Sequence, residues 1–283
     1  MTQGIHRELA AATEDGLLEP GPPRHLGALQ DRTTLLRGAA LGFLAASWAG
    51  LSWGNRGWEF VNPVLLPTPV EVVQSGYELA RDGLLQRHLA ISLLRVMEGF
   101  GLAATAALAL GILAGMSKLA RSLVEPLIEF LRPIPPLAFL PMFLVWFGLG
   151  ETSKVAFIAY TTFFPMFVTI AAAVVHVDIH LLRAASSLGA TRWQLIRHVV
   201  LPSALSGIII GLRVGFGLAI FVIVGAEFMG ADSGLGYMIM EGRTFFLPAQ
   251  IVMGALVLGI LGFLVNALLL RLEGRLLRWR SAM

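Results

Sequence analysis

The stretch R-A-A-S-S-L-G-A-T-R-W-Q-L-I-R-H-V-V-L-P, residues 183–202, interrupts a chain that is otherwise dominated by long apolar runs. It begins with small residues, contains one glycine, and continues with basic residues before a proline. Gly189 is the residue type that ends helices, and Thr191 and Gln194 have the spacing of a capping box. The stretch therefore predicts two short helices joined by a tight glycine turn, with Pro202 marking the start of the next apolar run.

The composition around this stretch is that of a membrane protein. Hydrophobic residues make up 56% of the 283 residues and charged residues only 14%, against about 25% charged residues in soluble proteins. The chain has no cysteine, which excludes disulfides and thiolate chemistry. Its net charge of +3 is better explained by basic residues retained on the cytoplasmic side of a membrane than by nucleic-acid binding.

Six apolar runs are long enough to cross a bilayer. They predict an all-α membrane protein whose six transmembrane helices cover about residues 35–53, 91–116, 123–149, 155–175, 204–226 and 247–270. The polar, proline-containing residues 1–34 are expected to be a flexible cytoplasmic tail, ahead of a membrane domain over residues 35–283. After the first run, Thr68 followed by Pro69 predicts the start of a short amphipathic helix at the outer surface.

If the N-terminus lies inside, most of the arginine and lysine residues between the apolar runs fall in the inner segments, and fewer fall in the outer segments. This bias predicts that both termini are cytoplasmic. The polar segment at residues 177–202, which we call the elbow, then also faces the cytoplasm. Ala184 and Ala185 leave room for another backbone, and Trp193 is of the size that fills a partner's pocket. On these residues alone, docking to a partner and simple contact with lipid headgroups both remain open.

Charged residues inside the apolar runs are costly and mark candidate functional positions. Arg95 and Glu98 are three residues apart on one helix face, and we expect them to form ion pairs, either within this helix or with another helix. Glu129 and Arg132 have the same spacing. Arg213 lies in the fifth run, and Glu227 lies at its outer end. Either ion pairing or contact with an anion that crosses the membrane would explain them.

The third run is unusual for its prolines, at positions 126, 133, 135, 136 and 141. Each proline removes a backbone donor, and broken backbone at membrane depth is tolerated where it lines a wet cavity or is buried in protein. A kinked packing helix is the alternative. We expect residues 132–141 to border a passage or gate, and the candidate residues for this role are Arg132, Pro133, Pro135, Pro136, Phe139, Arg213 and Glu227. Glycines at 207, 211, 215 and 217 predict tight helix packing.

The spacing A-A-x3-G-x9-V-x-L-P in the elbow resembles the EAA loop of transmembrane subunits of ATP-binding-cassette importers. Further runs, L-R-P-I-P-P-L-A-F-L-P, W-F-G-L-G-E-T-S-K, G-L-R, A-E and S-G-L-G-Y, resemble the taurine, sulfonate and nitrate importer permeases. The resemblance covers about residues 65–271 and implies the MetI-like fold of type I importers. Arg183 replaces the glutamate that usually leads the loop, so any contact made by that glutamate is not carried over.

The resemblance implies a bacterial inner-membrane permease that imports a small anion, with taurine or another sulfonate ahead of nitrate. The implied partners are a second copy of the chain, two cytoplasmic ATPase subunits that hold ATP and magnesium, an extracytoplasmic substrate-binding protein, and membrane lipid. The elbow would be the coupling helix that docks on the ATPase. The residues implied for this docking are Arg183, Ala184, Ala185, Leu188, Gly189, Ala190, Thr191, Trp193 and Leu195.

The chain lacks the sequence G-x-x-x-x-G-K-[ST] of a P-loop, so we do not expect it to hydrolyse ATP, and we expect it to bind no cofactor or metal itself. Two other classes are kept as alternatives. A self-sufficient secondary carrier or channel would transport without ATPase subunits, and inverted repeats are a common feature of such sequences. An intramembrane enzyme would need a metal, acid–base or nucleophile constellation, and no convincing one is found in the spans.

Overall fold

A computed structural model describes residues 26–58, 61–228 and 230–276. Every regular element in these ranges is helical, as the predicted all-α class requires. The chain divides into two compact units, residues 1–69 and 70–283, and each is described by itself. The prediction of a flexible tail at residues 1–34 falls mostly outside the described residues, and the first described helix begins at Leu26.

The first unit contains helix α2 (Leu26–Trp58) and the 3-10 turn η1 (Pro63–Leu65). Helix α2 includes the first predicted span and extends beyond it at both ends. After the helix, the side chain of Asn55 holds the returning chain through two bonds to the backbone of Val61, each 2.9 Å long. The indole N–H of Trp48 donates to the carbonyl oxygen of Pro67 at 3.2 Å. These bonds satisfy backbone groups where the helix ends.

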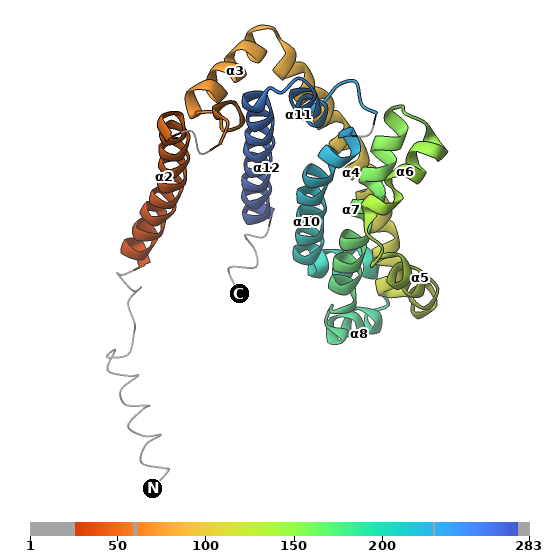
Figure 1. Cartoon of the computed structure of the whole chain (residues 1–283). Coiled ribbons are helices and arrows are strands. Elements are labelled where there is room, and N and C mark those ends of the chain that lie inside the picture. Colours follow the sequence, from red (N-terminus) through yellow and green to blue (C-terminus); the bar gives the residue numbers. More distant parts are fainter. Residues whose placement is uncertain (1–25, 59–60, 229, 277–283) are drawn as a thin grey trace, which may run out of the picture. The chain divides into compact units, whose positions relative to one another are not determined.

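The second unit carries the remaining helices (Figure 1). They are α3 (Pro69–Arg81), α4 (Leu84–Met116), α5 (Lys118–Leu131), α6 (Pro136–Phe147), α7 (Glu151–Val175), α8 (Ile179–Ser187), α9 (Arg192–Leu195), the π-helical turn η2 (Ile196–Val200), α10 (Leu201–Phe228), α11 (Leu235–Thr244) and α12 (Pro248–Leu276). Helix α3 begins at Pro69, as predicted. Helix α11 does not correspond to any helix predicted from the sequence.

Four helical stretches in the described residues are long and apolar enough to cross a membrane: 84–116, 151–175, 192–228 and 248–275. The pair α5 and α6 is a fifth candidate, but the two helices are bent by 99° at a short break. The third predicted span, residues 123–149, is therefore not one straight helix. The break follows Leu131 and ends at Pro136, within the proline-rich segment that was predicted to be irregular.

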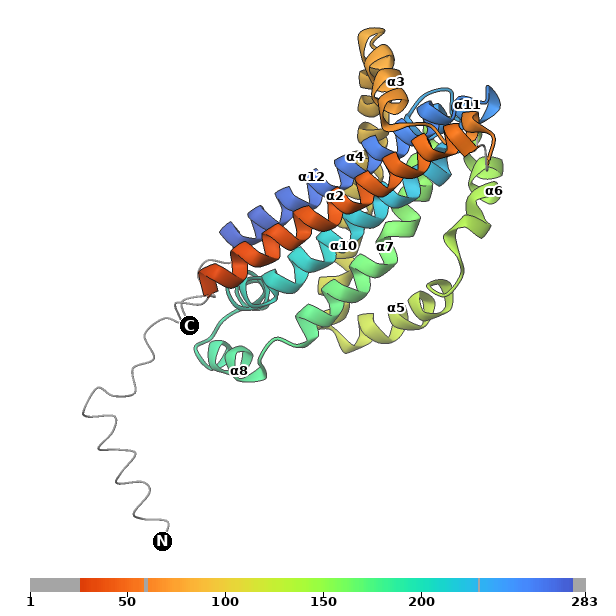
Figure 2. The same ribbon diagram turned by 60° about the vertical axis from the view of Figure 1, so that its left-hand side comes forward.

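Helix α7 packs against both α4 and α10, and Figure 2 shows it running beside α10. Glycines on both neighbours allow the close approach. A Cβ atom on Gly99 of α4 would collide with Ile158, and one on Gly215 of α10 would collide with Met166. The prediction of tight packing is confirmed for Gly207, Gly211 and Gly215. It is wrong for Gly217, which has open space around it.

The fifth crossing helix does not start at Pro202 as the sequence suggested. Helix α9, the π-helical turn and α10 form one continuous helical stretch from Arg192 to Phe228. In the π-helical turn the N–H of Leu201 bonds to the carbonyl of Ile196, one residue further back than in an α-helix. Such a turn lets the helix continue through the following proline, which has no backbone N–H to donate. The second arm of the elbow is thereby rigidly continuous with a crossing helix.

Candidate functional site

A buried ion network joins four segments at the end of the bundle opposite the elbow. Arg95 of α4 makes a two-pronged contact with Glu151 at the start of α7, through Nε at 2.5 Å and Nη2 at 2.6 Å. Its Nη1 donates to Glu227 of α10 at 2.8 Å and to the carbonyl oxygen of Ser233 at 2.6 Å. Only 2% of the Arg95 side chain and none of the Glu227 side chain is exposed.

The carboxylate of Glu227 fixes the connection between α10 and α11. Its Oε1 also accepts the Ser92 hydroxyl at 2.7 Å, and its Oε2 accepts the N–H of Gly236 at 2.7 Å. Ser92 in turn accepts the N–H of Leu235 at 2.8 Å. Nearly every polar atom of the pair therefore has a partner, which a charge removed from water requires.

Ion pairing within or between helices was expected for Arg95 and Glu98; it is confirmed between helices for Arg95, whereas Glu98 forms no ion pair among the described residues. Arg95 reaches across to α7 and α10. The sequence could not rank these partners, because Glu151 and Glu227 become neighbours of Arg95 only when three helices pack together. Glu227 had been predicted for a passage or gate, and it lies inside the buried network. The backbone contacts of Leu235 and Gly236 were missed, although the run S-G-L-G had been noted.

The connection between α10 and α11 carries one exposed acid beside the network. The hydroxyl of Ser233 donates to Asp232 at 3.0 Å. This hydrogen bond favours the charged form and holds the pKa of the Asp232 carboxyl below its usual value. The loop thus presents a fixed negative charge next to the buried Arg95 network.

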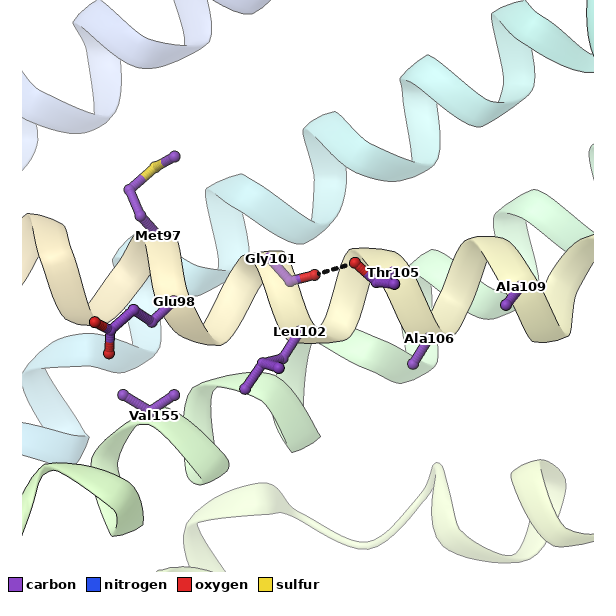
Figure 3. A pocket seen from close by; sticks show the side chains of 8 residues that line it. All are labelled: Met97, Glu98, Gly101, Leu102, Thr105, Ala106, Ala109 and Val155. Atoms are coloured by element: carbon purple, nitrogen blue, oxygen red, sulfur yellow. Dashed lines mark hydrogen bonds between the residues drawn. The ribbon is translucent and has the colours of Figure 1, made fainter.

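Glu98 lines an open groove of about 730 Å³ along α4 (Figure 3). The groove is lined by Met97, Glu98, Gly101, Leu102, Thr105, Ala106 and Ala109, with Val155 from α7. The Thr105 hydroxyl donates to the carbonyl of Gly101 at 2.8 Å, so it is satisfied within its own helix. Among the described residues, Glu98 has no ion-pair partner.

The residues predicted to border a passage near the break between α5 and α6 differ in their exposure. Arg132, Pro133 and Pro135 are exposed, whereas Phe139 on α6 is half-buried and stacks edge-on against Tyr160 of α7, with ring centroids 5.5 Å apart. Pro136 occupies the first position of α6, where its missing N–H costs nothing. The proline segment therefore connects an arm, α5, to a helix that packs on the bundle.

Arg132 and Arg213, both predicted for the passage, have different surroundings. Arg213 on α10 bonds to Glu273 on α12 at 2.8 Å, so it ties two crossing helices together. Arg132 has no partner among the described residues. It lines a cavity of about 270 Å³ between α5 and the elbow end of α7, together with Arg121, Glu125, Glu129 and His176.

The elbow has the predicted form, with two short helices around a glycine turn. Gly189 has φ of +79°, and the N–H of Ala190 reaches back to the carbonyl of Ala185 at 3.1 Å, as in a Schellman cap. Thr191 and Gln194 form the predicted capping box: the Thr191 N–H donates to the Gln194 amide oxygen at 2.8 Å. This turn therefore has a fixed angle.

The elbow also exposes large apolar side chains. Leu188 is 89% exposed and Trp193 is 66% exposed. A cavity of about 300 Å³ lies beside the turn, lined by Ala185, Leu188, Gly189, Ala190, Gln194, His198 and Val199. Arg183 is exposed, and nothing in the structure explains why it stands in place of the motif glutamate. A rigid turn that presents leucine and tryptophan has the character of a docking element.

Comparison with known proteins gives a family match over most of the second unit. The family model described as binding-protein-dependent transport system inner membrane component matches residues 107–280. The match includes α7, the elbow, α10 and α12, and it begins within α4.

Individual relatives cover most of the chain. The putative aliphatic sulfonates transport permease protein SsuC of Bacillus subtilis (strain 168) is 39% identical, over 78% of this chain and 80% of that protein. The taurine transport system permease protein TauC of Escherichia coli (strain K12) is 37% identical, over 81% and 85% respectively. Among solved structures, an inward-facing MetNI methionine ABC transporter chain is similar with a TM-score of 0.62 and 21% identity, over 68% of this chain and 96% of that one.

Proposed function

This chain belongs to the family of binding-protein-dependent transport system inner membrane components, and from that membership we propose that it forms the passage of an ATP-driven sulfonate importer. The proposed cargo is taurine or another small sulfonate, with nitrate or a different small organic anion as the alternative. The relatives in Bacillus subtilis and Escherichia coli, an aliphatic sulfonate permease and a taurine permease by name, support a sulfonate.

The proposed topology has six transmembrane helices in a bacterial inner membrane, with both termini in the cytoplasm. The basic residues of the inner segments support this orientation. It places the elbow in the cytoplasm and the Arg95 network at the outer end of the bundle. Helix α2 would be the first crossing helix, and the bent pair α5–α6 the third.

The elbow is the observation that carries the proposal. Its fixed Gly189 turn, exposed Leu188 and Trp193, and rigid continuation into α10 suit a lever that docks on a separate ATPase subunit. Movement of that subunit would then be transmitted along residues 192–228 into the membrane. Two copies of this chain and two ATPase subunits, which hold ATP and magnesium, would make the complex. A substrate-binding protein would deliver cargo at the outer side.

Reconstitution tests this function directly. We expect proteoliposomes that contain the permease, its ATPase and its binding protein to accumulate labelled taurine only when ATP is present. Parallel assays with ethanesulfonate and nitrate define the cargo class. Accumulation by the permease alone, driven by an ion gradient and indifferent to ATP, would identify a secondary transporter instead. Failure to move any sulfonate while nitrate is taken up would move the cargo to the alternative.

A further inference from the structure

The cavity between α5 and α7 has an unusual arrangement of charges. It has a volume of about 270 Å³, at the small end of ligand sites, which span about 300–1,000 Å³ for drug-sized molecules. Its floor is apolar, with the buried side chains of Ile128 and Phe167. Its charged groups come mainly from α5, and they differ in whether they already have partners.

Arg121 and Glu125 are already occupied. They approach each other to 3.8 Å, and the Arg121 guanidinium also donates to the carbonyl oxygens of Ala114 and Gly115. The Nδ1 atom of His176 contacts the carbonyl oxygen of Ala172 at 2.7 Å. These contacts account for three of the five titratable groups that line the cavity.

Glu129 and Arg132 are the two charges that remain. They are three residues apart, a spacing at which opposite charges on a helix commonly pair. Within the described residues, however, neither side chain forms an ion pair or hydrogen bond with the other or with any third residue. Both line the same cavity. Both side chains are exposed where they line the cavity, and no described residue neutralises either charge, so both are free to contact a bound molecule.

We propose that this cavity binds a zwitterion, whose oxyanion group contacts Arg132 and whose ammonium group contacts Glu129. The planar guanidinium suits a tetrahedral sulfonate or phosphate, because its N–H groups can donate to two oxygens at once. A plain anion would satisfy Arg132 but would be repelled by Glu129. The pair of charges thus selects for molecules that carry both signs a few bonds apart.

Two molecules share this chemistry: an aminosulfonate cargo and the headgroup of phosphatidylethanolamine. The cargo interpretation rests on the proposed function, and it makes Glu129 and Arg132 the residues that prefer aminosulfonates over sulfonates without an amine. The cavity lies directly beside the elbow, since His176 is followed by α8 at Ile179. An occupant would therefore lie next to the proposed coupling helix.

The test uses the permease–ATPase complex in lipid nanodiscs made of phosphatidylglycerol alone. Binding of labelled taurine is measured by equilibrium dialysis, with ethanesulfonate as the competitor that lacks the amine. We expect Glu129→Gln and Arg132→Gln each to weaken taurine binding by about tenfold or more, the loss typical of a charge-assisted hydrogen bond. Glu129→Gln should strengthen the weak binding of ethanesulfonate, because it removes the carboxylate that repels a plain anion, and Arg132→Lys should retain part of the taurine affinity. Glu78→Gln, an exposed acid on α3, is the matched control.

A second arm identifies the source of the ligand. If the site holds lipid, phosphatidylethanolamine added to the discs will be retained through purification by the wild type, and less by Glu129→Gln and Arg132→Gln. Equal affinity of wild type and both variants for taurine and for this lipid would overturn the proposal. ATP-driven taurine uptake is measured on the same preparations. A wild type that transports while its variants bind normally refutes only the zwitterion site, whereas a wild type that transports no sulfonate refutes the proposed cargo.

Discussion

The guanidinium of Arg95 on α4 lies 2.8 Å from the carboxylate of Glu227 on α10, and both side chains are almost completely buried. The two residues are 132 positions apart in the chain. Together with Glu151 and the backbone of Ser233, they join the ends of α4, α7 and α10 to the start of α11. This end of the bundle is therefore expected to move as one body when the elbow end is displaced.

Removing one partner of this pair leaves the other charge buried without compensation. Replacement of Arg95 by methionine should therefore destabilise the protein by about 3–5 kcal/mol. The thermal midpoint of the detergent-purified protein measures the loss. The double variant Arg95→Met, Glu227→Gln should recover part of it, because no unpaired charge then remains buried. Arg87→Gln on the exposed face of α4 is the control, and a loss of the same size there would contradict the explanation.

Gly234 is a second test of the network. It has φ of +115°, and a Cβ atom at this position would collide with the carboxylate of Glu227. Gly234→Ala should lower the thermal midpoint and increase amide exchange at Leu235 and Gly236. Gly217→Ala adds the same methyl group into open space within α10, where alanine is the better helix former, and should not lower the thermal midpoint or increase exchange. If the two alanine variants behaved alike, close packing against Glu227 would not be the reason for the glycine.

The capping box at Thr191 should stabilise the second arm of the elbow. Thr191→Ala removes the side chain that accepts the N–H of Gln194, and loss of such a cap costs about 1 kcal/mol. Hydrogen exchange should increase in residues 192–195 and remain unchanged in α4. Thr105→Ala, which removes a hydroxyl bonded within its own helix, is the control. Unaltered exchange at residues 192–195 in the Thr191 variant would show that the cap is dispensable.

Gly189→Arg should uncouple ATP hydrolysis from uptake while leaving the membrane helices folded. No atom lies within 4 Å of the position where a side chain would start, but the positive φ strains any other residue and the arginine would project from the turn. Gly83→Arg is a close control. Gly83 lies outside the elbow, directly before α4, and it has φ of +75° and equally open surroundings. ATP-dependent taurine uptake in proteoliposomes is the measurement. Normal uptake by the Gly189 variant, or an equal loss in the Gly83 variant, would argue against the elbow as coupling element.

Leu188 should contribute to docking because it is the most exposed large apolar side chain of the elbow. Leu188→Asn is expected to reduce co-purification of the ATPase subunit several-fold, the effect of losing an apolar anchor in a partner's pocket. Leu65→Asn, at an exposed leucine in η1, should not change it. Full recovery of the ATPase with the Leu188 variant would place the contact elsewhere on the elbow.

The chain's local patterns determined much of the architecture. Hydropathy located four of the six predicted crossing helices as single apolar helices, and the bent pair α5–α6 is a fifth candidate among the described residues. The Gly189 turn and the Thr191 capping box lie where their residue types predicted them, and Pro69 starts α3. These features depend on a few consecutive residues, whose backbone preferences and hydrogen bonds act locally. The proline cluster also located the break between α5 and α6, although it did not reveal the 99° bend. Pro202 does not mark the start of a helix as predicted, because the π-helical turn before it lets the helix continue through it.

The ion pairs were decided only by the tertiary structure. Arg95 has Glu98 on its own helix but bonds to Glu151 and Glu227, and Arg213 bonds to Glu273. Glu129 and Arg132 have favourable spacing and remain apart. Helical periodicity shows which charges share a face, whereas their partners depend on which helices approach closely and which groups lose contact with water. That approach is set by glycines and large side chains far apart in the chain, so sequence spacing alone could not identify the buried network.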